Sequence, residues 1–190
     1  MLETVPNLEL SVSVTTRTRR PTERDGIDYT FVDDVEFDRL IEVEELLEWA
    51  EVFGARYGTP AGPIRRALDA GRDALLEIDV QGARQVREAM PEAILIFLAA
   101  PSLAELERRL RSRGTEDEAR LKHRMEKASD ELEAASWFDE RVVNDDLERA
   151  SSQVAAMIEA SRARSGAQPP RPDVRPYPED PSTPEGTTHP

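Results

Sequence analysis

Two short apolar segments, residues 75–80 and 94–99, limit the folds open to this chain more than any other feature of its sequence. Each has the length of a single strand, and each is followed by apolar residues at helical spacing. Apolar strands that alternate with helices are typical of a parallel sheet covered by crossover helices. The sequence therefore predicts an α/β fold.

The first half of the chain predicts shorter elements. Leu10, Val12 and Val14 alternate with hydroxyl side chains, which is the pattern of a half-buried strand. Further elements are predicted in this half as a strand at about residues 29–32 and helices at about residues 35–42 and 62–71.

Two capping boxes mark the start of helices in the second half. Ser102 and Glu105 have the required spacing, and so have Thr115 and Glu118. The second of these helices is highly charged and is predicted to end near residue 132.

The end of the chain changes in composition. A last strand is predicted at residues 141–143, followed by a helix that Asn144 or Asp145 caps. Residues 165–190 then hold eight of the fourteen prolines and almost no large apolar side chains. Such a segment cannot bury enough surface to offset the entropy of ordering, so residues 163–190 are predicted to be a disordered tail.

Composition restricts the classes of function. A length of 190 residues with 38% hydrophobic content predicts one domain with at most a small subdomain. The net charge of −14 disfavours binding to nucleic acid or anionic membranes, so a bound anion needs a local cluster of cations. The absence of cysteine excludes disulfides and thiolate chemistry and fits a cytoplasmic protein. No apolar segment has the length of a membrane span.

Four arginines, Arg17, Arg19, Arg20 and Arg24, form such a cluster. Beside the hydroxyl side chains of the first strand, they are suited to hold a phosphate dianion by charge-assisted hydrogen bonds. The alternative is a solvated turn with surface arginines, and this segment alone does not separate the two.

Glu77 and Asp79 place two carboxylates on one face of an apolar segment. Like charges beside a buried strand need a cation, hydrogen-bond donors or water to offset their desolvation. Because ligands of open α/β sheets bind at strand ends, the pair predicts a site. Pairing with structural arginines is the alternative.

A second set of arginines lies on the two capped helices. Arg109 and Arg113 share one helix face, Arg120 and Arg124 share another, and Gly114 lies between the helices. A mobile segment that carries arginines can neutralise charge on a transferring phosphoryl group. A solvated charged helix face is the alternative.

Together these segments resemble guanylate kinase, the P-loop nucleoside monophosphate kinase that moves the terminal phosphoryl group of ATP to GMP. The resemblance runs from about residue 10 to residue 159. It depends on the ordered motifs SVSVTTRTRRPTERDGIDYTF, EWAEVFGARYGT, LEIDVQG, RGTE and VVNDDL, which are weak singly and highly specific as a set.

The resemblance implies how the domain is divided. It implies a parallel sheet flanked by helices, a small mixed β subdomain that binds GMP and a helical lid. The kinase-like domain would span residues 1–162, with the GMP-binding part at about 10–60, the core at 72–112 and 135–162, and the lid at 113–134.

The resemblance also implies which residues bind GMP. A carboxylate that accepts two parallel N–H bonds matches the N1 and N2 edge of guanine and rejects adenine, and Glu48 would take that role. The other implied residues are Arg17, Arg20, Tyr29 and Tyr57 on the phosphate, Ser13 and Thr59 on guanine O6, and Glu77 near the acceptor.

On the donor side, the resemblance implies ATP with Mg²⁺. Asp79 would act near the acceptor and contact the metal only through water, so no residue is expected to bind the metal directly. Arg109, Arg113 and Arg124 would close on the ATP phosphates, and Asn144 would lie beside adenine. The phosphate of GMP is already ionised, so the reaction needs no histidine base.

The start of the chain departs from the family pattern. Family members begin with a strand and a G-x-x-x-x-G-K-S/T loop, which holds the ATP phosphates and the metal. Here ten residues precede Ser11, without glycine or lysine. We therefore expect the central first strand to be missing, the sheet to be open and turnover of the chain as given to be impaired. A late-assigned start or a fragment is favoured over true loss of catalysis. The alternative function is an inactive GMP-binding or protein-interaction module.

Overall fold

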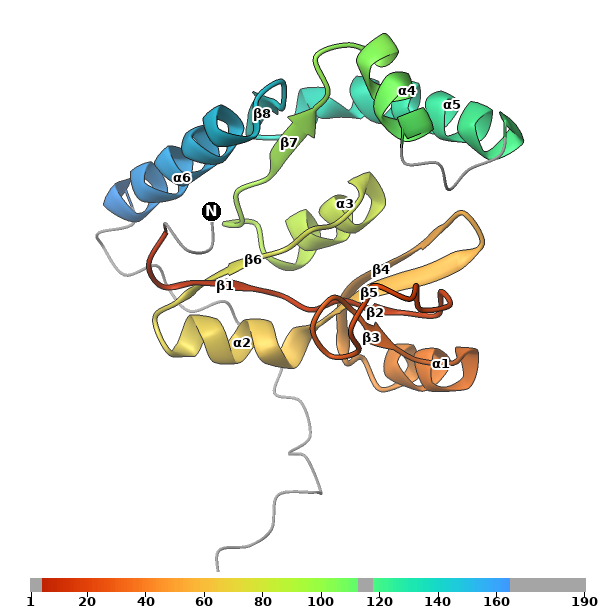
Figure 1. Ribbon diagram of the computed structural model, residues 1–190. Helices are drawn as coiled ribbons and strands as arrows, with labels where there is room; N and C mark the ends of the chain where they lie inside the picture. The colour runs from red at the N-terminus through yellow and green to blue at the C-terminus, as the bar shows by residue number, and fades with distance from the viewer. Residues whose placement is uncertain (1–4, 113–117, 165–190) are drawn as a thin grey trace, which may run out of the picture.

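The structure, a computed structural model, describes residues 5–112 and 118–164 of the chain. Strands alternate with helices along most of it, and the helices lie against small sheets (Figure 1). The predicted α/β fold is confirmed. In the part of the chain that is described, no helix is both long and apolar enough to cross a membrane.

The parallel strands form two separate pairs. Strand β1 (Leu8–Leu10) pairs with β6 (Asp73–Leu75), and β7 (Ile96–Ala99) pairs with β8 (Glu140–Val143). Within the described residues no hydrogen-bonded ladder joins β6 to β7, and Leu98 of β7 is 56% exposed. The expectation of an open sheet is thus confirmed.

Helices pack against these pairs and form most of the core. Helix α3 (Val80–Ala89) packs through Ala83 and Val86 against Leu95, which leads into β7. Helix α6 (Leu147–Arg164) packs against β8, while α2 (Ala61–Asp69) lies beside β6. The remaining helical elements are α4 (Leu103–Ser112), α5 (Glu118–Ala134) and the short 3₁₀ helix η1 (Ala135–Trp137).

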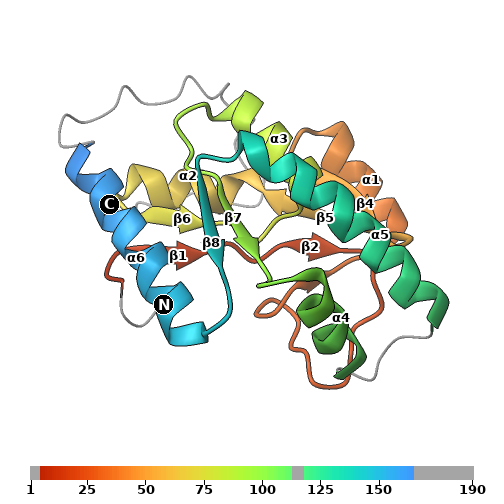
Figure 2. The same cartoon turned by 90° about the horizontal axis from the view of Figure 1, so that it is seen from above.

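A second, mixed sheet forms the smaller part of the molecule. Its strand order is β3 (Thr30–Phe31), β2 (Val14–Thr15), β5 (Ala55–Pro60) and β4 (Leu46–Val52), with β2 and β3 parallel and the other pairs antiparallel. Helix α1 (Asp34–Glu42) covers one face of this sheet, where Phe37 and Leu40 pack on Val14. Viewed from above, α5 crosses the region of the β4–β5 hairpin (Figure 2).

A bulge in β4 decides which side chains face which side of the mixed sheet. The register of β4 against β5 shifts between Leu46 and Glu48. As a result Leu46 and Trp49 both pack on the α1 side, while Leu47 and Glu48 both lie on the opposite side. Bulges redirect side chains in this way near functional sites.

Two predicted strands are shorter than their sequence patterns suggest. The alternating segment at residues 10–15 is split, because β1 ends at Leu10 and β2 begins at Val14. The apolar segment at 75–80 leaves the sheet after Leu75. Its last residue, Val80, begins helix α3, which Asp79 caps by accepting a hydrogen bond from the Gly82 amide at 2.9 Å.

The helix ends also differ in detail from the predictions. The Ser102 cap is confirmed, since Ser102 Oγ accepts a 3.1 Å bond from the Glu105 amide, while the Glu105 carboxylate accepts from Arg108 and Arg109. Thr115 lies outside the described residues. The cap of α6 is Asp146, which accepts from the Arg149 amide at 2.8 Å, and neither Asn144 nor Asp145. Helix α6 continues to residue 164, so the first two residues of the predicted tail, 163 and 164, are helical.

Candidate nucleotide-binding site

An open hollow lies between the mixed sheet and the start of α3. Its lining includes six of the residues that the sequence predicted for the acceptor site, brought together from separate parts of the chain. The lining residues are Ser13, Tyr29, Glu48, Ala50, Val52, Tyr57, Glu77, Ile78 and Asp79.

Glu48 is the buried carboxylate of this pocket. It is 5% exposed, and its Oε1 accepts a 2.6 Å hydrogen bond from the Thr59 hydroxyl. Burial raises the pKa of Glu48, and the negative charge of Asp79 raises it further. The bulge in β4 therefore delivers to the pocket a carboxylate that is desolvated and oriented.

The Thr59 hydroxyl, predicted to contact guanine O6, has a protein partner in the structure. It donates a hydrogen bond to Glu48, and its contact with guanine stays a prediction. A hydroxyl has one proton to donate, so Thr59 orients the carboxylate, and Ser13 is the pocket hydroxyl left for O6.

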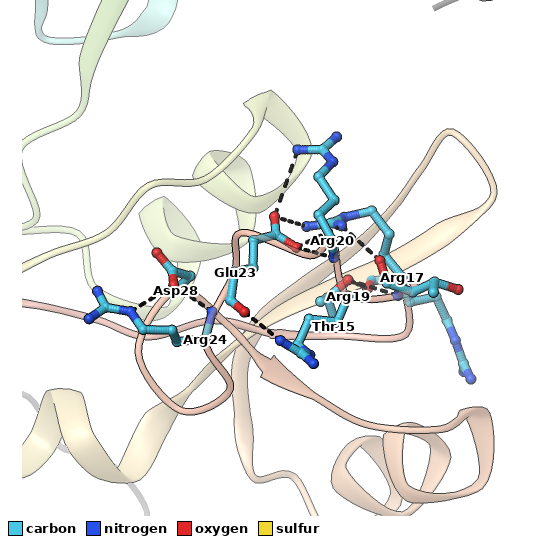
Figure 3. A network of polar contacts seen from close by, with 9 residues as sticks. Thr15, Arg17, Arg19, Arg20, Glu23, Arg24 and Asp28 are labelled. Atoms are coloured by element: carbon cyan, nitrogen blue, oxygen red, sulfur yellow. Dashed lines mark hydrogen bonds and ion pairs between the residues drawn. The ribbon is translucent and has the colours of Figure 1, made fainter. Parts of the chain in front are cut away.

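Arginines of the basic cluster converge on one carboxylate, that of Glu23 (Figure 3). Arg17 bonds it with both terminal nitrogens, at 2.7 and 3.1 Å, and the Arg20 side chain lies 3.7 Å from it. Arg17 lowers the pKa of Glu23. This fork geometry is the one that arginines use toward phosphate, so the cluster is arranged to hold an anion.

Only part of the basic cluster takes part in this clamp. Arg19 donates to the backbone carbonyl of Glu23 at 2.6 Å, and Arg24 pairs with Asp28 at 3.6 Å. These two arginines follow the alternative of a surface turn. Sequence reasoning gave no role to Glu23, although a lone acid inside a basic motif was a signal for a clamp partner.

The clamp adjoins the pocket through aromatic rings. The Arg17 guanidinium lies 5.4 Å from the centre of the Tyr29 ring, which in turn lies 6.0 Å from the Tyr57 ring. Burial raises the pKa of Tyr29, which keeps its hydroxyl protonated as a hydrogen-bond donor. One cleft therefore has a carboxylate on one side and a cationic clamp on the other.

Comparison with known protein families identifies the family of this chain. A family model described as guanylate kinase matches residues 2–161, which is most of the chain. The chain belongs to the guanylate kinase family. Its class of activity is that of a nucleoside monophosphate kinase.

Named guanylate kinases match over most of their own length. The guanylate kinase of Thermobifida fusca (strain YX) is 54% identical over 155 residues, which are 82% of this chain and 79% of that protein. That of Nocardia farcinica (strain IFM 10152) is 51% identical over 164 residues, 85% of each protein. The crystal structure of guanylate kinase from Anaplasma phagocytophilum has a TM-score of 0.70 and 40% identity, covering 81% of this chain and 76% of that one.

The described residues predicted for the donor side lie on α4, on α5 and directly after β8. Arg109 bonds the Asn144 carbonyl at 2.8 Å and the Glu105 carboxylate at 2.7 Å, so these two predicted donor residues are in contact. Arg124 lies with its guanidinium 4.8 Å from the Phe53 ring, at the tip of the β4–β5 hairpin. Arg113 lies outside the described residues.

Gly82 is a site residue that sequence reasoning missed. A methyl group built at Gly82 would lie 2.3 Å from Glu48 Oε2 and 2.9 Å from its Cδ. The carboxylate therefore occupies the space that a side chain in the first turn of α3 would need. The available signal in the sequence was a glycine near the start of a helix. Glycine destabilises a helix by about 1 kcal/mol relative to alanine, so its presence there suggests that a side chain would not fit.

Proposed function

We propose that this guanylate kinase binds GMP in the pocket and transfers the terminal phosphoryl group of ATP to it, giving ADP and GDP. The observation that carries the proposal is the buried Glu48 carboxylate across one cleft from the Arg17 clamp. An inactive interaction module is not favoured, because the relatives are named as enzymes.

Guanine would be recognised by hydrogen bonds to its edge. The ionised carboxylate of Glu48 accepts the two parallel N–H groups of guanine N1 and N2, and the Ser13 hydroxyl donates to O6. Adenine has no N1 hydrogen and carries a donor in place of O6, so it leaves these groups unpaired. Sites built this way reject analogues strongly, because unpaired buried polar groups are costly.

The GMP phosphate would replace the carboxylate of Glu23 in part of the clamp. Arg17, Arg20, Tyr29 and Tyr57 supply donors at this end of the pocket, as Arg17 and Arg20 already do toward Glu23. The phosphate oxygen attacks as an ionised group, so transfer depends on position and charge neutralisation and needs no histidine.

A kinase of this family uses ATP with a divalent metal, which we infer to be Mg²⁺. When bound, the metal would neutralise charge on the ATP phosphates. Both carboxylate oxygens of Asp79 already accept hydrogen bonds, Oδ1 from the Gly82 amide and Oδ2 from Gln81 and Lys127. A contact of Asp79 with the metal would therefore run through a metal-bound water. Arg109, Arg113 and Arg124 would add positive charge on the donor side.

Thermal unfolding in the presence of nucleotides tests the proposal on the chain as it is. We expect GMP at about 100 times its dissociation constant to stabilise the protein by about 2.7 kcal/mol, with a clear rise in Tm. AMP at the same concentration should give no comparable rise. Equal shifts with GMP and AMP would refute the assignment of Glu48 to guanine.

The composition bears on where the protein acts and on its partners. The absence of cysteine supports a cytoplasmic location, and the charge of −14 supports the absence of a nucleic-acid partner.

Guanine binding and stability should respond to pH in opposite directions because of Glu48. Its pKa is raised by burial, so guanine affinity should fall as the pH drops through that raised pKa, where an exposed glutamate would still be ionised. In the empty protein the folded state holds the proton more tightly than the unfolded state does. Stability should therefore be lost as the pH rises from the usual glutamate pKa of about 4.3 through the raised value. Burial also raises the pKa of Glu131, which adds to the same trend.

Calorimetry with guanosine, together with urea unfolding, measures both trends between about pH 4.5 and pH 8. Guanosine is used because it lacks the phosphate of GMP, whose second pKa of about 6 falls within this range. Guanosine affinity that stays constant over this range would show that Glu48 does not bind the base as a carboxylate.

Gly82→Ala is expected to lower the affinity for GMP about tenfold, because the added methyl displaces the Glu48 carboxylate. The matched control is Gly62→Ala in the first turn of α2, where the methyl would meet only Arg66 Nη1, at 3.4 Å. This control should retain GMP affinity and gain about 0.4–1 kcal/mol of stability. Calorimetry and urea unfolding of both variants check the result, and unchanged GMP binding by Gly82→Ala would contradict it.

A further inference from the structure

The acceptor pocket collects negative charge without a cation among its lining residues. Glu48, Glu77 and Asp79 all line it, and a nucleotide phosphate adds further negative charge nearby. Like charges that line one pocket oppose one another's ionisation unless a cation offsets them. The Arg17 clamp lies at the end of the pocket formed by Tyr29 and Tyr57, where the proposed function places the GMP phosphate, so another cation is needed beside the carboxylates.

That cation is Lys127 of helix α5. Its ammonium nitrogen lies 3.1 Å from Asp79 Oδ2, and the two side chains are only 24% and 18% exposed. Neither the sequence patterns nor the family resemblance assigned a role to this lysine. The contact joins α5 to the first turn of α3, across 48 residues of sequence.

The tip of the β4–β5 hairpin braces Lys127 in place. Phe53 and Gly54 form the turn of the hairpin, both with positive φ, a conformation that phenylalanine rarely adopts. The Phe53 ring lies 5.4 Å from the Lys127 ammonium, 4.8 Å from the Arg124 guanidinium and 5.4 Å from the His123 ring. These cation–π and edge contacts hold α5 against the hairpin that carries Glu48.

We propose that Lys127 is a positioning residue of the acceptor pocket, which fixes the Asp79 carboxylate and neutralises its charge beside Glu48. The proposal rests on the binding of GMP in this pocket and names the residue that keeps the guanine carboxylate ionised there. Lys127 acts on Glu48 through Asp79, because the charge of Asp79 raises the pKa of Glu48. An uncompensated Asp79 would oppose the ionisation of Glu48 more strongly.

Several other charged or titratable groups face this part of the pocket and bear on the pH dependence. Glu131 lies 3.6 Å from Lys127 on α5 and competes with Asp79 for the ammonium. Arg124 and His123 of α5 lie against the same Phe53 ring as Lys127. Further such groups are Glu77 ahead of α3, Tyr57 on β5, Tyr29 beside β3 and Arg17 next to Tyr29. None of these is altered in the variants below.

The test compares Lys127→Met with Lys127→Arg and with Lys122→Met. Methionine keeps the length of the chain without its charge, arginine restores the charge, and Lys122 is a 79% exposed lysine on the same helix. The first readout is the pH titration of the Glu48 carboxyl group by NMR in the nucleotide-free protein. The second is the affinity for GMP as a function of pH by calorimetry.

We expect Lys127→Met to raise the pKa of Glu48 by about half a pH unit or more and to weaken GMP binding about 3- to 10-fold near neutral pH. Lys127→Arg should restore most of both, and Lys122→Met should match the parent chain. In an Asp79→Asn background, the effect of Lys127→Met should shrink to less than half, as expected when two residues act through one contact.

Each failure has its own meaning. An unchanged Glu48 titration in Lys127→Met overturns the inference, even if GMP binds to the parent chain. An undiminished effect in the Asp79→Asn background shows that Lys127 does not act through Asp79 and also overturns it. Failure of the parent chain to prefer GMP over AMP refutes the proposed function instead, and the Glu48 titration still tests Lys127.

Discussion

Glu48→Gln is expected to lower the affinity for GMP about 100-fold while leaving the chain folded. The carboxylate offers two acceptors to the N1 and N2 hydrogens of guanine, whereas the amide turns one acceptor into a donor that faces a donor. Two hydrogen bonds to a charged group are affected, each worth about 1.5–3 kcal/mol, so a loss of this size follows. The empty variant should be no less stable, because a neutral amide removes the desolvation penalty that raises the pKa of Glu48.

Calorimetry with GMP and IMP measures the effect and its cause. IMP lacks the N2 amino group, so the parent chain should prefer GMP and the variant should largely lose that preference. Glu51→Gln is the matched control, since Glu51 lies on the same strand and is exposed to solvent. If Glu48→Gln binds GMP as the parent does, the carboxylate is structural and the guanine assignment is wrong.

Phe37→Ala is expected to cost about 3–5 kcal/mol in the free energy of unfolding, the usual range for removing a fully buried phenylalanine. Phe37 is 0% exposed, and its ring packs on the Trp49 ring and under the Arg56 guanidinium at 4.7 Å. Together with Leu40 it packs α1 against the mixed sheet that carries Glu48. A loss of this size is a large fraction of the stability of a typical domain.

Urea unfolding measures this loss, and Val35→Ala provides the control. Val35 lies on the same helix but is 78% exposed, so its truncation should change stability by less than about 0.5 kcal/mol. GMP should partly rescue Phe37→Ala, because ligand binding stabilises the folded state. A Phe37 variant as stable as the parent would show that the mixed sheet does not depend on α1.

Local patterns in the sequence predicted the positions of several strands and helices. Alternation and apolar runs located strands near residues 10–15 and 94–99, and the spacing of Ser102 and Glu105 located the start of α4. The boundaries failed where a single polar residue overrode the pattern. Asp79 caps α3, so the helix begins at Val80, inside the predicted strand, and Asp146 caps α6 in place of Asn144 or Asp145.

The polar partners inside the site were less predictable. Thr59 was assigned to guanine, and the structure shows that it holds Glu48. Glu23 was passed over, and it fills the arginine clamp. In both cases the residue type was correct for a polar site, but the choice between ligand and neighbour depends on distances that no local pattern contains.

By itself the sequence determined the fold class and the family and predicted six residues that line one pocket, because these follow from local periodicity and from motifs with fixed spacing. Only the tertiary structure decided that Glu48 occupies the space above Gly82 and that Lys127 faces Asp79. Both contacts join segments far apart in the chain. Such contacts depend on how helices and sheets pack, and a bulge of one residue in β4 is enough to redirect them.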